Sequence, residues 1–131
     1  MPGGSELAVA KTFLAGLVAQ DFARLADVLA PSVHLRALLP GGLREWTGAA
    51  DVADRFARWF GNTTHFGVLE ATAGEVADRI QLQWRFRLQA DRLGPGWFVV
   101  EQLAYADVDD QHQIACLDLL CTGYRPERSD G

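Results

Sequence analysis

The sequence lacks a hydrophobic run long enough to cross a membrane. A transmembrane helix needs about 20 consecutive apolar residues, and polar or charged residues interrupt every apolar stretch of this 131-residue chain before that length. The segment from Met1 to Glu6 also lacks the basic stretch and apolar core of a secretory signal. We therefore expect a cytoplasmic protein with no membrane partner.

Positive charge is also scarce. The 12 lysines and arginines are outnumbered by 17 aspartates and glutamates, which gives a formal net charge of -5, and the basic residues form no cluster. A protein that binds nucleic acid needs concentrated positive charge to displace counterions from the phosphates. The composition therefore argues against a nucleic-acid partner.

Cysteine is rare, and its positions exclude a disulfide. Cys116 and Cys121 are five residues apart in one predicted strand, so their side chains point to opposite faces and can neither bridge nor share a metal. The three histidines, His34, His65 and His112, are scattered along the chain. We predict two buried free thiols, no metal and no other cofactor.

Apolar residues spaced three and four apart predict helices in the first half of the chain. The first helix is expected from Ser5, a residue suited to the N-cap, to about Ala19. The other two are expected over 21–30 and from Thr47 to Phe60. Two short strands, 33–39 and 43–46, are predicted between the second and third helices.

The second half reads as sheet, and its clearest signal is the strict alternation of apolar and polar residues from Ile80 to Leu88. Further strands are predicted over 66–73, 97–108 and 114–125, with a turn at Gly74-Glu75. Strands of this length must bend. We therefore predict one α+β domain over residues 1–131, in which a curved antiparallel sheet wraps three N-terminal helices as a cone-like barrel around a central pocket. Residues 1–4 and 126–131 are expected to be flexible ends.

Short motifs at the junctions between these elements resemble the nuclear transport factor 2-like superfamily, and within it the SnoaL-like proteins. They are Gln20-Asp21-Phe22, Pro31-Ser32-Val33, Gly48 and Val100-Glu101-Gln102. The resemblance covers nearly the whole chain and implies a pocket for a small apolar molecule. Because polyketide cyclases and ketosteroid isomerases share this fold, it also implies an acid/base isomerase or cyclase that acts on an apolar ring compound bearing a carbonyl group.

Only one of three positions of the ketosteroid isomerase site keeps a suitable side chain. Phe13 stands where that family has a tyrosine, and the aspartate base falls on Ala37 in an ungapped match or near Leu39 in a count back from Gly48. Glu101 stands where it has a protonated aspartate. Neither a phenyl ring nor a methyl group transfers a proton. The alternative is therefore a ligand-binding or dimerisation module of the same fold without catalysis.

Glu101 is the strongest candidate for a catalytic group, with Tyr105 to assist it, but its surroundings depend on strand register. If Ala90 pairs with Trp97, Glu101 faces Phe86 on an apolar inner face, where a carboxyl group is able to act as a general acid or base. If the register shifts by one residue, Glu101 meets Arg85 or Arg87 as an ordinary cross-strand ion pair. The sequence leaves both registers open.

The predicted cavity walls are large apolar side chains from the helices and the inner sheet face: Phe13, Leu17, Leu35, Ala37, Trp59, Trp84, Phe86 and Leu103. His34 and Asp118 are expected to face outward. The outer face is also expected to carry an apolar patch of Phe98, Val100, Ala104, Ala106 and Leu120. A patch of this kind predicts a homodimer formed sheet against sheet.

Overall fold

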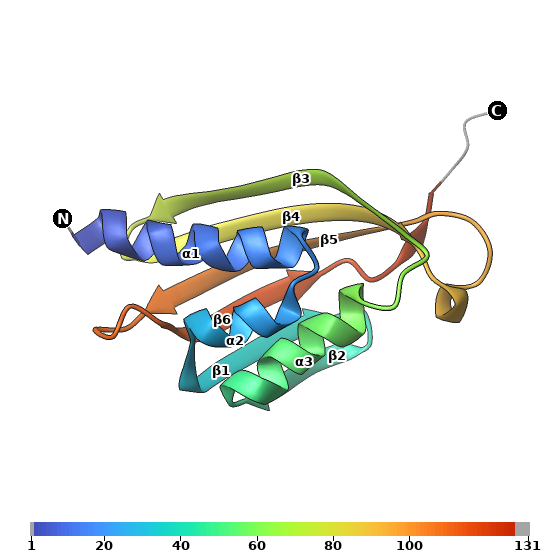
Figure 1. Cartoon of the computed structure of the whole chain (residues 1–131). Coiled ribbons are helices and arrows are strands. Elements are labelled where there is room, and N and C mark those ends of the chain that lie inside the picture. Colours follow the sequence, from blue (N-terminus) through green and yellow to red (C-terminus); the bar gives the residue numbers. More distant parts are fainter. Residues whose placement is uncertain (1, 128–131) are drawn as a thin grey trace.

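Three helices lie on one face of a long, curved sheet (Figure 1). The structure is a computed structural model, and it describes residues 2–127. The helices are α1 (Pro2–Val18), α2 (Phe22–Val28) and α3 (Ala49–Phe60), and a short 3-10 helix follows at Asp91–Leu93. No helix among the described residues is both long and apolar enough to span a bilayer.

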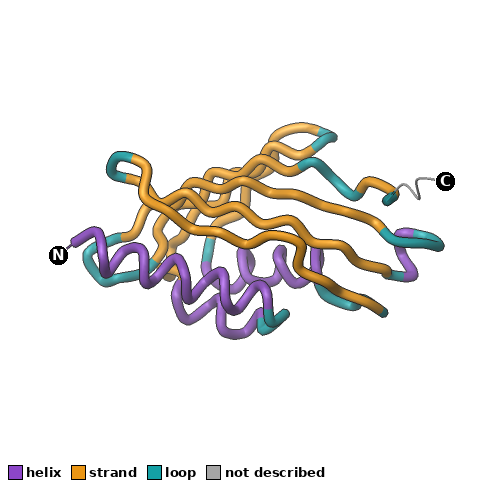
Figure 2. Tube along the Cα trace, turned by 90° about the horizontal axis from the view of Figure 1, so that it is seen from above, coloured by secondary structure: helices purple, strands orange, loops and turns teal. Residues whose placement is uncertain are grey.

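The sheet contains seven strands and is open, with β2 and β3 at its two edges. Figure 2 shows the helices against one face of the strands. The strands are β1 (Leu29–Leu39), β2 (Gly42–Thr47), β3 (His65–Val76), β4 (Arg79–Gln89), β5 (Phe98–Val108), β6 (Ile114–Cys121) and β7 (Arg125–Pro126). Their order is β2-β1-β6-β5-β4-β3, and β7 pairs with the first residues of β5. Only β1 and β6 run parallel. The predicted α+β class is confirmed.

Several predicted boundaries are wrong. β1 begins at Leu29 and not at Val33, and β6 ends at Cys121 and not at Arg125. α1 begins at Pro2 and not at Ser5, so residues 2–4 belong to a helix, because proline fits the first helical turn, where its missing N–H is not needed. The β3–β4 turn lies at Ala77-Asp78, and Gly74 pairs with Gln81 inside the sheet. Of the predicted flexible tail, residue 126 lies in β7 and residues 128–131 lie outside the described part.

Aromatic rings fill the space between the helices and the middle of β4. The Phe13 ring on α1 lies 5.4 Å from the Phe56 ring on α3, and both lie within 6.3 Å of the Trp84 ring on β4. Phe60 meets Phe86 at 5.1 Å in the same edge-to-face manner. This part of the expected central pocket is therefore packed core.

The β4–β5 register is the second of the two alternatives. The even-numbered residues of β4 are buried as predicted, but Arg85 pairs with Glu101 and Phe86 pairs with Val100. The inner side chains of β5 are consequently Val100, Gln102, Ala104 and Ala106, each no more than 1% exposed. The predicted exposure of Val100, Ala104 and Ala106 is wrong, and Phe98 is half-buried. Leu120 is 51% exposed, as predicted.

Candidate functional site

An inner cavity of about 260 Å³ lies beyond the aromatic core, where β1, β6 and α3 end. Half of its lining comes from the inner sheet face, and the rest comes from α3 and from the chain that follows β1 and β6. The lining residues are Leu39, Pro40, Trp59, Val100, Gln102, Cys121, Gly123 and Tyr124. None of these side chains carries a charge at neutral pH.

Gln102 is the buried polar side chain of this cavity, with 1% of its surface exposed. The indole Nε1 of Trp84 donates a hydrogen bond to Gln102 Oε1 over 3.0 Å. Because an indole N–H only donates, this contact fixes the orientation of the amide group. Gln102 Nε2 is therefore turned away from Trp84, and it is buried without a hydrogen-bond partner. A buried amide nitrogen without a partner costs free energy that a bound acceptor would recover.

Three side chains form a row across the inner face at this point. Trp84 on β4 pairs with Gln102 on β5, and Gln102 pairs with Cys121 on β6. Directly opposed residues of antiparallel strands point to the same face, with Cα atoms about 5 Å apart. The Cys121 thiol therefore lies next to the Gln102 amide, and the backbone N–H of Gly123 donates to its sulfur over 3.3 Å.

The chain after β6 closes the cavity. We call residues 122–127 the C-terminal strap. The hydroxyl group of Tyr124 donates to the backbone carbonyl of Trp59 at the end of α3, and burial raises the pKa of that hydroxyl group. Farther along, Glu127 accepts two hydrogen bonds from Arg87, at 2.8 and 2.9 Å. Gly123 has a φ of +77°, and a Cβ atom there would lie 2.7 Å from the Pro40 side chain, so this turn requires glycine.

A larger and more open groove of about 500 Å³ lies at the same end of these strands; it shares Leu39, Pro40 and Cys121 with the inner cavity, and its other strand residues face outward. Glu101 is its charged residue, and its carboxylate accepts a hydrogen bond from Gln83 Nε2 at 2.7 Å. Beside it, four leucines that are paired from strand to strand cross the sheet. We call this set the leucine row: Leu43, Leu38, Leu120 and Leu103.

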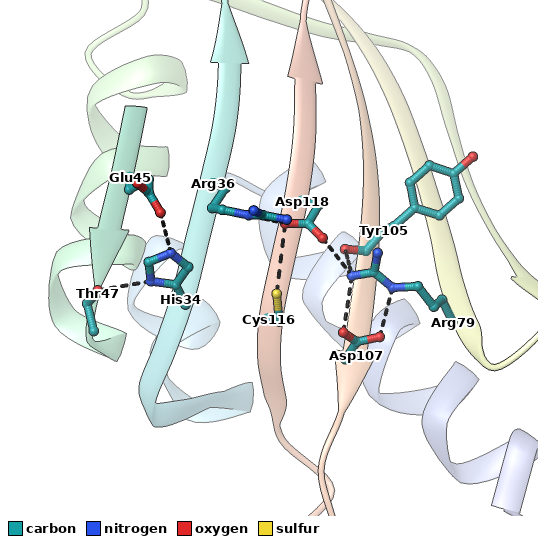
Figure 3. Close-up of polar contacts among 9 residues, drawn as sticks. All are labelled: His34, Arg36, Glu45, Thr47, Arg79, Tyr105, Asp107, Cys116 and Asp118. Atoms are coloured by element: carbon teal, nitrogen blue, oxygen red, sulfur yellow. Dashed lines mark hydrogen bonds and ion pairs between the residues drawn. The ribbon is translucent and has the colours of Figure 1, made fainter. Parts of the chain in front are cut away.

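A network of charges borders the leucine row on the outer face (Figure 3). Asp118 on β6 accepts hydrogen bonds from Arg36 on β1 at 2.9 Å and from Arg79 on β4 at 3.0 Å. Arg79 also binds Asp107 on β5 at 2.8 Å. The hydrogen bond from Arg36 is the main reason that the pKa of Asp118 lies below its usual value. The pKa of the neighbouring Cys116 is raised by burial and by the charge of Asp118.

The structure separates the residues that the sequence predicts to share one site. Glu101 and Tyr105 lie on the outer face, where Tyr105 accepts a hydrogen bond from Gln81. Leu103 lines the outer groove and Trp59 lines the inner cavity. The remaining predicted wall residues are fully buried in the core and do not line the inner cavity: Phe13, Leu17, Leu35, Ala37, Trp84 and Phe86.

Sequence reasoning missed the polar lining of the inner cavity, namely Gln102, Cys121 and Tyr124. The one available signal was Gln102 itself, an uncharged polar residue inside an almost wholly apolar strand. His34 and Asp118 face outward as expected, and the two cysteines are free and lie on opposite faces. The prediction that both thiols are buried is wrong, because each is partly exposed near an end of β6. Within residues 2–127, no three histidine, cysteine, aspartate or glutamate side chains gather as a metal site would require.

Comparison with known proteins identifies the fold and not the activity. No family model and no curated protein matches the sequence. Among solved structures, a limonene-epoxide-hydrolase-like epoxide hydrolase of M. tuberculosis is 17% identical with a TM-score of 0.69, and the match covers 92% of this chain and 85% of that one. A SnoaL-like protein of Shewanella putrefaciens, described as a candidate polyketide cyclase, is 10% identical with a TM-score of 0.69 over 88% of each chain.

A nuclear transport factor 2-like protein of Burkholderia xenovorans is similar to the same degree. It is 13% identical with a TM-score of 0.68, and the match covers 91% of this chain and 90% of that one. At such low identities a shared structure shows a shared fold alone. This chain has the nuclear transport factor 2-like fold, as its junction motifs predict.

Proposed function

We propose that this protein, which has the nuclear transport factor 2-like fold, binds a small and largely apolar molecule in the inner cavity. The ligand carries a hydrogen-bond acceptor, such as a ketone carbonyl, that pairs with Gln102 Nε2. The observation that carries this proposal is the buried, unpartnered amide nitrogen of a residue that lines the cavity. Pockets for small molecules typically combine apolar walls with a few fixed polar groups of this kind.

The lining also favours a neutral ligand. Apart from Gln102, the polar groups of the lining side chains are the Trp59 indole N–H, the Cys121 thiol and the Tyr124 hydroxyl group, and the hydroxyl group already donates to the Trp59 backbone carbonyl. An anionic ligand would lose its hydration without meeting a cation. An uncharged carbonyl compound loses less hydration free energy on binding than an anion does, and it gains the hydrogen bond from the Gln102 amide.

Binding without acid/base turnover fits the surroundings of this cavity better than catalysis does. Phe13 and Ala37 provide no proton-transfer group, and the Glu101 carboxylate lies on the other face of the sheet. The activities named for the similar structures belong to those proteins. The proposal therefore gives Glu101 and Tyr105 no part in ligand binding.

Titration with cyclohexanone, followed by NMR, tests the proposal. We expect saturable chemical-shift changes at the Gln102 side-chain amide, which would bind the ketone oxygen, and at the Trp84 indole N–H, which donates to the same amide group. Gln102→Leu should raise the Kd about fivefold to tenfold, the value of one hydrogen bond to a neutral acceptor.

Two control variants separate the cavity from the rest of the sheet. Gln81→Leu makes the same substitution on the outer face of β4, and Glu101→Gln removes the charge of the outer groove; both should leave the Kd unchanged. If Gln102→Leu binds cyclohexanone as tightly as the parent protein does, or if the shifts fall on the outer face, the proposal is wrong.

The leucine row supports a second proposal, a homodimer formed sheet against sheet. Leu38, Leu43 and Leu120 are 49%, 59% and 51% exposed, and strand pairing makes them direct neighbours. Leu103 extends the row onto β5. Neighbouring strands are about 4.8 Å apart, so the four residues form one continuous apolar band, which a two-fold partner with the same band would cover.

A further inference from the structure

Cys121 combines two properties that its counterpart Cys116 lacks. It lines the inner cavity where this meets the outer groove, and it is the direct cross-strand neighbour of Gln102. Cys116 lies on the outer face beside Asp118, at 3.9 Å from sulfur to carboxylate oxygen. A thiol next to a buried, unpartnered N–H donor has the arrangement needed to add to a polarised carbon–carbon double bond, because the donor binds the oxygen on which charge develops.

We infer that Cys121 is a covalent attachment site for α,β-unsaturated carbonyl compounds that enter the inner cavity, with Gln102 Nε2 holding their oxygen. This inference rests on the proposed function, because it assumes that the cavity admits a carbonyl compound with its oxygen on Gln102. It goes beyond that function in naming a chemical class of ligand and a bond that forms with it.

The geometry of an enone fits the row. Its carbonyl oxygen and its β carbon lie at the two ends of one short conjugated unit. Gln102 and Cys121 are opposed residues whose Cα atoms are about 5 Å apart, and both side chains face the cavity. An oxygen that accepts from Gln102 Nε2 therefore leaves the β carbon on the side of the β6 thiol.

The reaction balances without an oxidant or a metal. The thiol loses its proton to water, and the thiolate sulfur attacks the β carbon to form a carbon–sulfur bond. The electron pair of the double bond shifts toward the carbonyl oxygen, where Gln102 donates to the enolate. The α carbon then takes a proton from water. The net change is the addition of S–H across the double bond.

Two neighbouring features act in the same direction. The backbone N–H of Gly123 donates to the Cys121 sulfur over 3.3 Å and so holds the thiol in place beside Gln102. On the outer face, burial and the Asp118 carboxylate raise the pKa of Cys116 and keep that thiol protonated. Cys116 therefore serves as an internal reference thiol in the same molecule.

The experiment exposes the full-length protein to cyclohexenone and follows both cysteines by peptide mass spectrometry. We expect Cys121 to be alkylated about tenfold faster than Cys116, because only Cys121 reacts with a bound reagent. Gln102→Leu should slow the reaction of Cys121 about tenfold through loss of the hydrogen bond to the developing oxyanion, and leave the rate at Cys116 unchanged.

Cyclohexanone supplies a test that needs no variant. It has the same carbonyl group and no double bond, so it should occupy the cavity and protect Cys121, but not Cys116, from cyclohexenone. If Gln102→Leu does not fold, this protection decides the question alone. Equal alkylation rates at the two cysteines, or an unprotected Cys121, would overturn the inference.

The two proposals fail in different ways. If cyclohexanone binds at Gln102 and cyclohexenone forms no adduct, covalent attachment is wrong and ligand binding stands. If cyclohexanone does not bind, both are wrong, and any adduct at Cys121 reports only an accessible thiol.

Discussion

Trp84 and Gln102 determine each other's place in the core. A tryptophan buried completely must give its indole N–H an acceptor, and Gln102 Oε1 supplies it at 3.0 Å. The cost appears at the other end of the amide, where Nε2 has no partner. Without a ligand, the hydrogen-bonding groups of Trp84 and Gln102 are therefore only partly paired. The unpaired amide nitrogen lowers the stability of the fold and favours the binding of a hydrogen-bond acceptor.

A double-mutant cycle measures this balance. In the parent protein, Gln102→Leu should lower the free energy of unfolding by about 1 kcal/mol, because it leaves the buried Trp84 N–H unpaired. In the Trp84→Phe background the same substitution should raise it by about 1 kcal/mol, because there it removes an amide group that has lost its one donor. Urea denaturation of the four proteins gives both values.

The test depends on the sign of the change in unfolding free energy that Gln102→Leu causes, which should be opposite in the two backgrounds. It does not depend on the size of that change. If Gln102→Leu has the same effect in both backgrounds, the two side chains are not coupled and Gln102 is not fixed by Trp84. The comparison is independent of any ligand.

Residue by residue, the sequence indicated the core better than the site. Leu35 and Ala37 alternate with polar neighbours and face inward, although they are packed core and not cavity wall. Val100, Ala104 and Ala106 were assigned to the wrong face because the apolar run that begins β5 has no alternation to follow. A single-residue change of register then moves every side chain to the other face.

Among the elements, Asp118 joins strands that are distant in the sequence. Its carboxylate on β6 binds Arg36 on β1 and reaches across β5 to Arg79 on β4 (Figure 3). The Asp118 side chain is 25% exposed, and that of Arg79 is 30% exposed. The contact between Asp118 and Arg79 is therefore less screened by water than the contact to Arg36, whose side chain is 53% exposed.

The lowered pKa of Asp118 predicts a stability that depends on pH. The hydrogen bond from Arg36 favours the charged carboxylate in the folded state, so its contribution is complete above the unfolded pKa of about 4 and is lost as the pH falls through the lower folded value. Asp118→Asn should cost about 1 kcal/mol of unfolding free energy at pH 7. Below both pKa values the difference from the parent protein should shrink toward zero.

Asp110→Asn is the matched control for this substitution. Asp110 is exposed in the turn between β5 and β6, so its replacement should change stability little at any pH. Denaturation at pH 7 and at about pH 3 measures both variants. A cost for Asp118→Asn that stays constant with pH would contradict the assigned role of the carboxylate charge.

At the level of elements, β4 was predictable and its partners were less so. One face of β4 packs on the helices and the other does not, so apolar and polar residues alternate along its sequence. Its turn with β3 was misplaced because Gly74 suggested a turn, whereas Ala77, with a φ of +55°, and Asp78 form it. On β5, Ala104 and Ala106 face inward on the side where α1 contacts the strand, and Leu103 faces outward.

For the whole molecule, the order of elements was sufficient to predict the fold, but the position of the cavity was not predictable. Cavity position depends on which rings meet in three dimensions: Phe13, Phe56 and Trp84 come from separate elements and fill the centre. The space that remains lies under the C-terminal strap, whose path depends on Gly123 and on the contact from Tyr124 to Trp59. These are contacts over long sequence distances that no local pattern records.

The outer face gives the last prediction, which concerns assembly. The leucine row crosses four strands, and its exposed members leave apolar surface that water solvates poorly. We expect the parent protein to sediment as a dimer at micromolar concentration. Leu120→Glu places a charge in the middle of the row, and in a two-fold interface it acts twice, so this variant should sediment as a monomer.

Leu69→Glu is the matched control, because Leu69 on the edge strand β3 is 47% exposed and lies outside the row. This variant should remain dimeric if the row, and not general surface hydrophobicity, holds the partners together. A parent protein that sediments as a monomer would rule out the interface, and a monomeric Leu69→Glu would move it to β3. Since Leu120 does not line the inner cavity, the monomeric Leu120→Glu variant should still bind cyclohexanone with the parent Kd.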